Sequence, residues 1–331
     1  MYAQINQSLK STSTYEKFLR LRLSLFRQVQ RKIFRKQKVK TISKISCALL
    51  GAMLLSSIFS GLVVGITEAV KLSLSTQSIQ MIGGCMSSVW YVYFFQLFTK
   101  SMKKRNINEV SLGRKNSICD GGRYLLILLG MTTLLSNVTD KIVNCLKIYL
   151  INGEMNEGVV ESYVENVPIV LLFVCAVIVS PIFEELLFRK ILLEKLLPYG
   201  KVIAIAISSL FFGLYHANLE QLLYTMFLGV LCANIVIITG KIKYAIYLHM
   251  AFNLFGVIIS DFIPIGAITT VLQIVFVMSA VLIFVFKGKT MFILKDEDCV
   301  ESFCAKKEFL SIGFTLYIAF FVIGSIRAMG E

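Results

Sequence analysis

The residues best suited to chemistry stand in the stretch Ser180–Lys190, where Glu184, Glu185 and Arg189 directly follow an apolar run over residues 167–179. Ionisable groups are costly within a membrane-spanning segment, so they persist there only when they are paired, solvated or functional. On a helix, Glu185 and Arg189 are i,i+4 neighbours with the acid before the base. Glu184 points about 100° away from them. This spacing predicts one carboxylate held by its own arginine and a second one, Glu184, free for chemistry.

The chain has only two histidines, and both lie within or beside apolar segments. His216 ends the sequence Phe212-Gly-Leu-Tyr-His216. His249 is followed four residues later by Asn253, which places both side chains on one face of a helix. A lone histidine in such a helix is usually a packing residue. Two of them, beside a glutamate pair, Arg189 and Asn253, favour a functional site instead.

The depths of these residues can be compared by counting from the turns. Glu184 and His216 stand at similar sequence distances on either side of Pro198-Tyr199-Gly200, which is a turn signal. If this turn joins two antiparallel helices, both side chains lie at similar depth. His249 lies closer to its own turn, near Lys241, so a tilted or re-entrant helix is needed to bring it level.

The elements that must position these residues are transmembrane helices. Hydrophobic residues make up 56% of the 331 residues, and charged residues 16%, against about a quarter in a soluble domain. Several apolar runs reach the ~20 residues that cross a bilayer. The sequence predicts an all-α polytopic membrane protein: a bundle of eight or nine transmembrane helices with an intramembrane polar site.

The charges and cysteines narrow the class further. The net charge of +14 is carried by bases at the ends of apolar runs, so lipid headgroups and topology explain it and no nucleic-acid partner is expected. The eight cysteines are scattered without a C-x-x-C, so neither a disulfide framework nor a zinc ribbon is indicated.

Changes in charge and hydropathy divide the chain into five regions. They are a basic cytoplasmic segment (1–44), N-terminal transmembrane helices (45–135), an external acidic connector (136–166), a helical core holding the candidate site (167–286), and a charged segment with a C-terminal transmembrane helix (287–331). The expected spans are 45–67, 79–98, 124–137, 167–197, 201–216, 222–239, 244–260, 263–286 and 309–326. Basic residues place the N-terminus and loop 99–123 in the cytoplasm, with 138–166 outside.

The basic N-terminal segment has two interpretations. Apolar residues recur at helical spacing among its bases, at Phe18, Leu21, Leu25, Val29 and Ile33. This pattern predicts an amphipathic helix on an anionic cytoplasmic leaflet, with anionic lipid as a partner. A solvated basic tail that follows the positive-inside rule explains the same residues equally well.

Three motifs, each on its own expected helix, carry a resemblance to a known family. Glu-Glu-x-x-x-Arg at 184–189, Phe-x-x-x-His at 212–216 and His-x-x-x-Asn at 249–253 together resemble the CPBP family of intramembrane endopeptidases. That family is named for CAAX proteases and bacteriocin-processing enzymes and is also called Abi. The resemblance covers roughly residues 120–286 and implies that 167–286 is a CPBP-like catalytic core.

The resemblance also implies roles. Glu184 and His216 would activate a water, His249 and Asn253 would stabilise the oxyanion, and Glu185 and Arg189 would shape the site or hold substrate. Peptide hydrolysis requires an activated water, a group that stabilises the oxyanion and a proton for the leaving amine. The residues alone would allow some of these roles to be exchanged, and Glu185–Arg189 could equally be a structural ion pair.

A zinc site is the competing interpretation of the same residues. Glu184, His216 and His249 form a plausible His₂Glu set. However, the chain has no H-E-x-x-H helix, and an asparagine such as Asn253 is a poor zinc ligand. We therefore expect a glutamate-dependent site without a cofactor, with zinc as the alternative.

The leading functional hypothesis is a multi-pass cell-membrane endopeptidase that acts on a membrane-associated peptide or protein. Low proline with abundant isoleucine and lysine indicates a bacterium of low GC content, where the resemblance points to peptide or bacteriocin maturation or to self-immunity. The alternatives are a non-catalytic partner or regulator of a sensor kinase or peptide exporter and, third, a transporter. No repeated halves with broken helices support a transporter.

Overall fold

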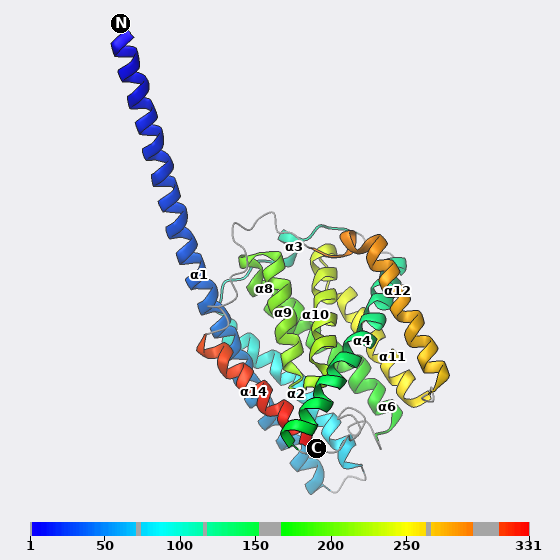
Figure 1. Cartoon of the computed structure of the whole chain (residues 1–331). Coiled ribbons are helices and arrows are strands. Elements are labelled where there is room, and N and C mark those ends of the chain that lie inside the picture. Colours follow the sequence, from blue (N-terminus) through cyan, green and yellow to red (C-terminus); the bar gives the residue numbers. More distant parts are fainter. Residues whose placement is uncertain are drawn as a thin grey trace.

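The structure is a computed structural model that describes residues 2–70, 74–114, 118–151, 167–262, 266–293 and 311–330. These residues form helices and no strands, as predicted for an all-α membrane protein (Figure 1). The elements are α1 (Tyr2–Ala69), α2 (Thr76–Thr99), α3 (Ile107–Val110), α4 (Ile118–Leu146), η1 (Lys147–Ile151), α6 (Ile169–Leu172), η2 (Phe173–Val179), α7 (Ser180–Glu185), η3 (Leu186–Leu192), α8 (Leu193–Leu196), η4 (Leu197–Tyr199), α9 (Lys201–Tyr215), α10 (Leu219–Thr239), α11 (Lys243–Phe262), α12 (Ala267–Met291) and α14 (Ile312–Gly330).

Every predicted span falls on a helix within the described residues. In the part of the chain that the structure describes, six helices are long and apolar enough to cross a membrane: Leu21–Ala69, Thr76–Thr99, Asp120–Tyr149, Ile169–Tyr199, Leu219–Thr239 and Ile268–Met291. α9 and α14 are shorter apolar helices. α11, with 20 residues, covers the predicted span 244–260 and carries His249 and Asn253.

The third span is longer than predicted. The helix does not fade near Asn137 but continues as α4 to Leu146 and then as the π-helical η1. Its polar residues find partners on α10: the Thr139 hydroxyl donates to the carbonyl of Glu220, and Lys147 Nζ lies 4.0 Å from the Glu220 carboxylate. Residues 138–151 of the expected external connector are therefore helical, and its acidic part beyond residue 151 lies outside the described residues.

The basic N-terminal segment and the first span form one helix. α1 runs from Tyr2 to Ala69 without a break, and its first half projects away from the bundle (Figure 1). The side chains of Leu21, Leu25 and Phe26 on this half are more than half exposed. The amphipathic stretch is thus an extension of the first span, and its partner stays a prediction.

The basic segment between α2 and α4 lies at one end of the bundle. The backbone N–H of Arg105 donates to Glu194, and those of Leu112 and Arg114 donate to the carbonyls of Ile237 and Ile238. These bonds tie the α2–α4 connection to the ends of α8 and α10. Gly240 closes α10 there with a φ of 73°, in the left-handed region that favours glycine. The α2–α4 connection therefore lies at the same end of the bundle as the ends of α8 and α10.

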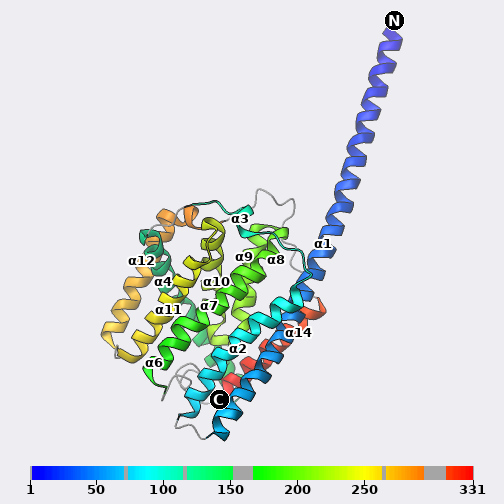
Figure 2. The same ribbon diagram turned by 180° about the vertical axis from the view of Figure 1, so that it is seen from behind.

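α10 forms the centre of the bundle. Two thirds of the most apolar stretch of α10 is buried inside the bundle, whereas only 6% of the corresponding stretch of α12 is buried. α12 therefore lies on the outside. Figure 2 shows α6 and α7 between α2 and α11, in front of this centre. Two buried aromatic residues of α9 pack to different sides: Phe211 contacts rings of α14, and Phe212 contacts Phe188 on the helix of the glutamates. The helix that carries the glutamates is thus held against a rigid core.

The orientation of the bundle can be tested by labelling. We expect Lys104, at the basic end, to lie in the cytoplasm and Tyr149, on η1, to lie outside. Their side chains are 64% and 83% exposed. In a cysteine-free background, a membrane-impermeant thiol reagent applied to intact cells should label Tyr149→Cys and spare Lys104→Cys. The opposite pattern would reverse the topology.

Candidate active site

The glutamates lie on a helix with two irregular stretches. Residues 169–199 run as one helix in which two π-helical segments, η2 and η3, flank the short α-helical turn α7. At Pro181 the helix departs from regular α-helical bonding: Ser180 N–H donates to the carbonyl of Cys175, five residues back, and Pro181 has no N–H. π-Helical turns inside helices are frequent at functional sites. Glu184 and Glu185 end the α-helical turn between the two.

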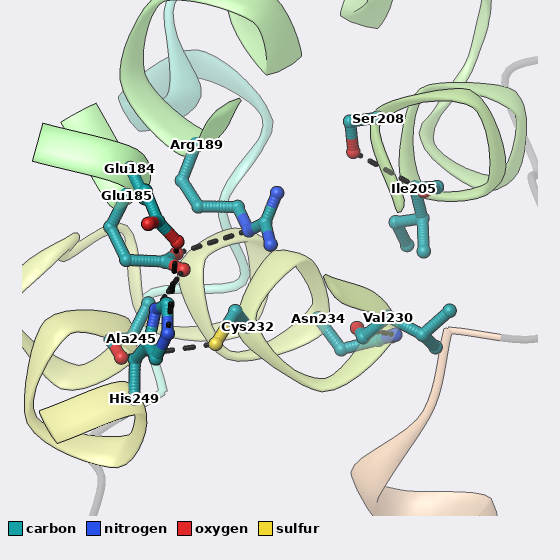
Figure 3. Close-up of polar contacts among 10 residues, drawn as sticks. All are labelled: Glu184, Glu185, Arg189, Ile205, Ser208, Val230, Cys232, Asn234, Ala245 and His249. Atoms are coloured by element: carbon teal, nitrogen blue, oxygen red, sulfur yellow. Dashed lines mark hydrogen bonds and ion pairs between the residues drawn. The ribbon is translucent and has the colours of Figure 1, made fainter. Parts of the chain in front are cut away.

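Glu185 is fully buried between a cation and an imidazole (Figure 3). One carboxylate oxygen, Oε2, lies 3.1 Å from Arg189 Nε, as the i,i+4 spacing predicted. The other, Oε1, lies 3.0 Å from His249 Nδ1 on α11. Arg189 is also fully buried, and its guanidinium stands 4.8 Å from the centre of the Phe212 ring. A charge this deep is tolerated because the ion pair and the aromatic face compensate it.

Glu184 faces the same histidine from the other side. Its Oε2 lies 3.8 Å from His249 Nε2, and its side chain keeps 13% exposure. Glu185 contacts two partners within 3.1 Å, whereas the contact of Glu184 with His249 is longer and its side chain keeps some exposure, as expected for one held and one less constrained carboxylate. If Glu185 accepts a hydrogen from Nδ1, the Nε2 atom and Glu184 must share a proton or a water, because two lone pairs would otherwise oppose each other.

His216 reaches the site through Phe212. Its Nδ1 lies 2.9 Å from the Phe212 carbonyl, one turn back, and must carry the hydrogen because a carbonyl only accepts. In the neutral ring, Nε2 is then an acceptor. The rings of His216 and His249 lie 5.2 and 5.7 Å from that of Phe212, both edge to face. The two histidines are therefore arranged around one phenylalanine.

Asn253 lies one turn beyond His249 and contacts a neighbouring helix, while its expected role at the oxyanion stays a prediction. Its Nδ2 donates to the carbonyl of Ala176 in η2, at 2.8 Å. One amide hydrogen is therefore committed to a contact between helices. Substituting Asn253 would therefore also remove a hydrogen bond between two helices.

The structure thus brings Glu184, Glu185, Arg189 and His249 into one cluster and places His216 and Asn253 beside it. Two features were not predicted from the sequence: the packing of Arg189 and both histidines against Phe212, and the hydrogen bond from Asn253 to the carbonyl of Ala176. Both had signals: Phe212 begins the motif that His216 ends, and Ala176 stands five residues before a proline. Cys232 was also missed; its thiol lies near the cluster and 3.8 Å from the carbonyl of Ala245 (Figure 3).

The zinc interpretation needs a set of converging donors. Among the described residues, which include Glu184, His216 and His249, no group of three His, Cys, Asp or Glu side chains is arranged to hold a metal ion. The Nδ1 atoms of both histidines already face protein oxygens, so only their Nε2 atoms remain as donors. The absence of zinc from the site therefore stays a prediction.

Comparisons with known proteins agree with the motifs. Residues 166–255 match the sequence profile of the Rce1-like family, described as type II CAAX prenyl endopeptidase Rce1-like. The chain is also 36% identical over 106 residues to a Bacillus subtilis (strain 168) protein named "Putative membrane peptidase YdiL". That match covers 31% of this chain and 42% of the relative, so less than half of the curated relative is matched. No solved structure matches the chain.

The matched segment contains all six candidate residues, from Glu184 to Asn253. The resemblance to the CPBP family that the three motifs carry is therefore confirmed for this part of the chain. The basic N-terminal half of α1 and the last helix, α14, lie outside the family match.

The buried ion pair makes a stability prediction. Arg189→Met would leave Glu185 buried without its cation and should lower the free energy of unfolding by about 3–5 kcal/mol. Adding Glu185→Gln should restore much of that loss, because the unpaired charge disappears. Unfolding in mixed detergent micelles would measure both variants.

Arg123→Met is the matched control. Arg123 pairs with Asp120 at 2.7 Å, but both side chains are more than a third exposed, so its loss should cost no more than about 1 kcal/mol. A double variant at Glu185 and Arg189 as unstable as Arg189→Met would show that the arginine acts through packing, not through its charge.

Proposed function

We propose that the protein is an intramembrane endopeptidase that hydrolyses a peptide bond in a membrane-associated peptide or protein. The observation that carries the proposal is the position of His249, held at Nδ1 by the ion-paired Glu185 and faced at Nε2 by Glu184. A purely structural ion pair has no need of the second carboxylate. The family match and the peptidase named among the relatives support the same class.

The proposed reaction begins at Glu184. Its carboxylate takes a proton from a water that His216 Nε2 helps to hold, and the hydroxide adds to the scissile carbonyl. His249, with hydrogens on both nitrogens, donates from Nε2 to the oxyanion, whose charge balances that of the ring, while Glu185 holds Nδ1. The proton on Glu184 then passes to the amide nitrogen as the carbon–nitrogen bond breaks. Atoms and charges balance without any other reactant.

Arg189 supports this chemistry from outside the reacting atoms, whereas Asn253 can serve both the packing of α11 and the oxyanion. Arg189 neutralises Glu185 within the core. Asn253 anchors α11 to η2 and keeps a second amide hydrogen, which is available to the oxyanion as the resemblance implies. The proposed substrates are precursors of secreted or membrane-bound peptides, in maturation or self-immunity, and the proposed location is the cell membrane with the N-terminus in the cytoplasm.

Glu184→Gln tests the general base. The amide keeps the shape of the side chain but cannot accept the proton, so turnover should fall ~10²–10⁴-fold. The measurement is hydrolysis of an internally quenched peptide library in detergent micelles, together with a comparison of membrane peptidomes from wild-type and variant cells. A precursor should accumulate in the variant.

Glu109→Gln is the matched control, since Glu109 is exposed in the short helix α3 of the α2–α4 connection. It should behave as the wild type. If Glu184→Gln also leaves the peptidome and the cellular phenotype unchanged, the protein acts as a binding partner and the peptidase proposal fails.

Chelation tests the alternative chemistry. Because the proposed steps use only side chains and water, the purified protein should keep its activity after exhaustive treatment with a strong zinc chelator. Metal analysis of the treated sample confirms that removal is complete. Loss of activity that added zinc restores would establish a zinc enzyme in place of the glutamate mechanism.

A further inference from the structure

The carbonyl of Ala176 lacks the backbone N–H donor that its own helix would normally provide. Ser180 N–H donates to the carbonyl of Cys175. The next N–H in this π-helical series belongs to residue 181 and would reach Ala176, but residue 181 is a proline and has none. Backbone carbonyls inside a membrane bundle require a donor, because an unpaired one costs as much as a lost hydrogen bond.

Asn253 supplies that donor from another helix. Its Nδ2 lies 2.8 Å from the Ala176 oxygen. One turn earlier on α11, His249 contacts Glu185 and Glu184. The same two helices are therefore joined at two points: a backbone carbonyl that the proline exposes, and the carboxylates of the proposed site.

We propose that Pro181 and Asn253 act as one positioning unit. Pro181 exposes the Ala176 carbonyl, Asn253 docks on it, and this contact fixes the height and rotation of α11 so that His249 meets both glutamates. Neither residue needs to touch substrate for this purpose. The contact itself stands on the geometry alone, whereas its consequence for turnover rests on the proposed function.

The first test is a stability cycle that needs no substrate. Asn253→Ala in the otherwise wild-type chain leaves the carbonyl without a donor and should lower the folding equilibrium constant roughly tenfold. In the Pro181→Ala chain, residue 181 regains an N–H that can reach Ala176, so the same change should cost less than about threefold. SDS-induced unfolding in mixed micelles measures all four proteins, and the cycle cancels the separate effect of Pro181→Ala.

Pro168→Ala provides the control cycle. Pro168 caps the start of α6, where a backbone N–H has no helical partner, so its replacement exposes or satisfies no carbonyl within the helix. The effects of Pro168→Ala and Asn253→Ala should therefore simply add. If Asn253→Ala lowers the folding equilibrium constant equally in the wild-type and Pro181→Ala chains, Pro181 and Asn253 do not act together and the proposal is wrong.

The second test is kinetic and uses the quenched peptide library. Asn253→Ala and Pro181→Ala should each lower kcat at nearly unchanged KM, and the double variant should be no slower than the slower single variant. If Asn253 serves only as an oxyanion donor, its loss multiplies with that of Pro181→Ala, and the positioning role is wrong. A wild-type protein without peptidase activity would instead reject the proposed function, and the stability cycle would still decide on the contact.

Discussion

The site depends on one constraint: a guanidinium buried without contact to water. Arg189 has no exposed surface, so its charge must be compensated by the protein. Glu185 supplies the opposite charge through one oxygen and thereby presents the other to His249. Glu184, next in sequence, then meets the remaining nitrogen of that ring. The positions of Glu185, His249 and Glu184 therefore follow from the need to neutralise Arg189.

Phe212 links this charged cluster to the second histidine. Its ring supports the Arg189 guanidinium on one face and stands edge to face with both imidazoles. Its carbonyl fixes the hydrogen of His216 on Nδ1. The Phe-x-x-x-His spacing therefore has a physical reason, because a side chain four residues on can return to the carbonyl one turn back. A smaller apolar residue at this position would leave the guanidinium without its aromatic face and both histidines without lateral support.

The parts of the structure that depend on local spacing could be predicted from the sequence. Runs of apolar residues indicate where the helices lie, and the i,i+4 rule places Arg189 beside Glu185. The extension of α4 past Asn137 was missed because the acidic residues of 138–166 indicated an external connector, whereas α10 provides Glu220 as a partner of Lys147. The sequence correctly separates the faces of Glu184 and Glu185, but it does not show that one histidine meets both through its two nitrogens.

The depth of His249 shows why the remainder needs the tertiary structure. Counted from its turn at regular α-helical rise, His249 should lie nearer the basic end of the bundle than Glu184 does. Between Glu185 and the turn at Tyr199, however, lies η3, whose wider π-helical turns hold more residues each, so this stretch advances less than an α-helix of equal length. α11 is also inclined to α10 in both views (Figures 1 and 2). η3 therefore brings Glu184 closer to the basic end and reduces the mismatch, whereas the inclination of α11 adds no depth to His249. The departure at η2 leaves one carbonyl for Asn253 and so keeps the inclined helix in register.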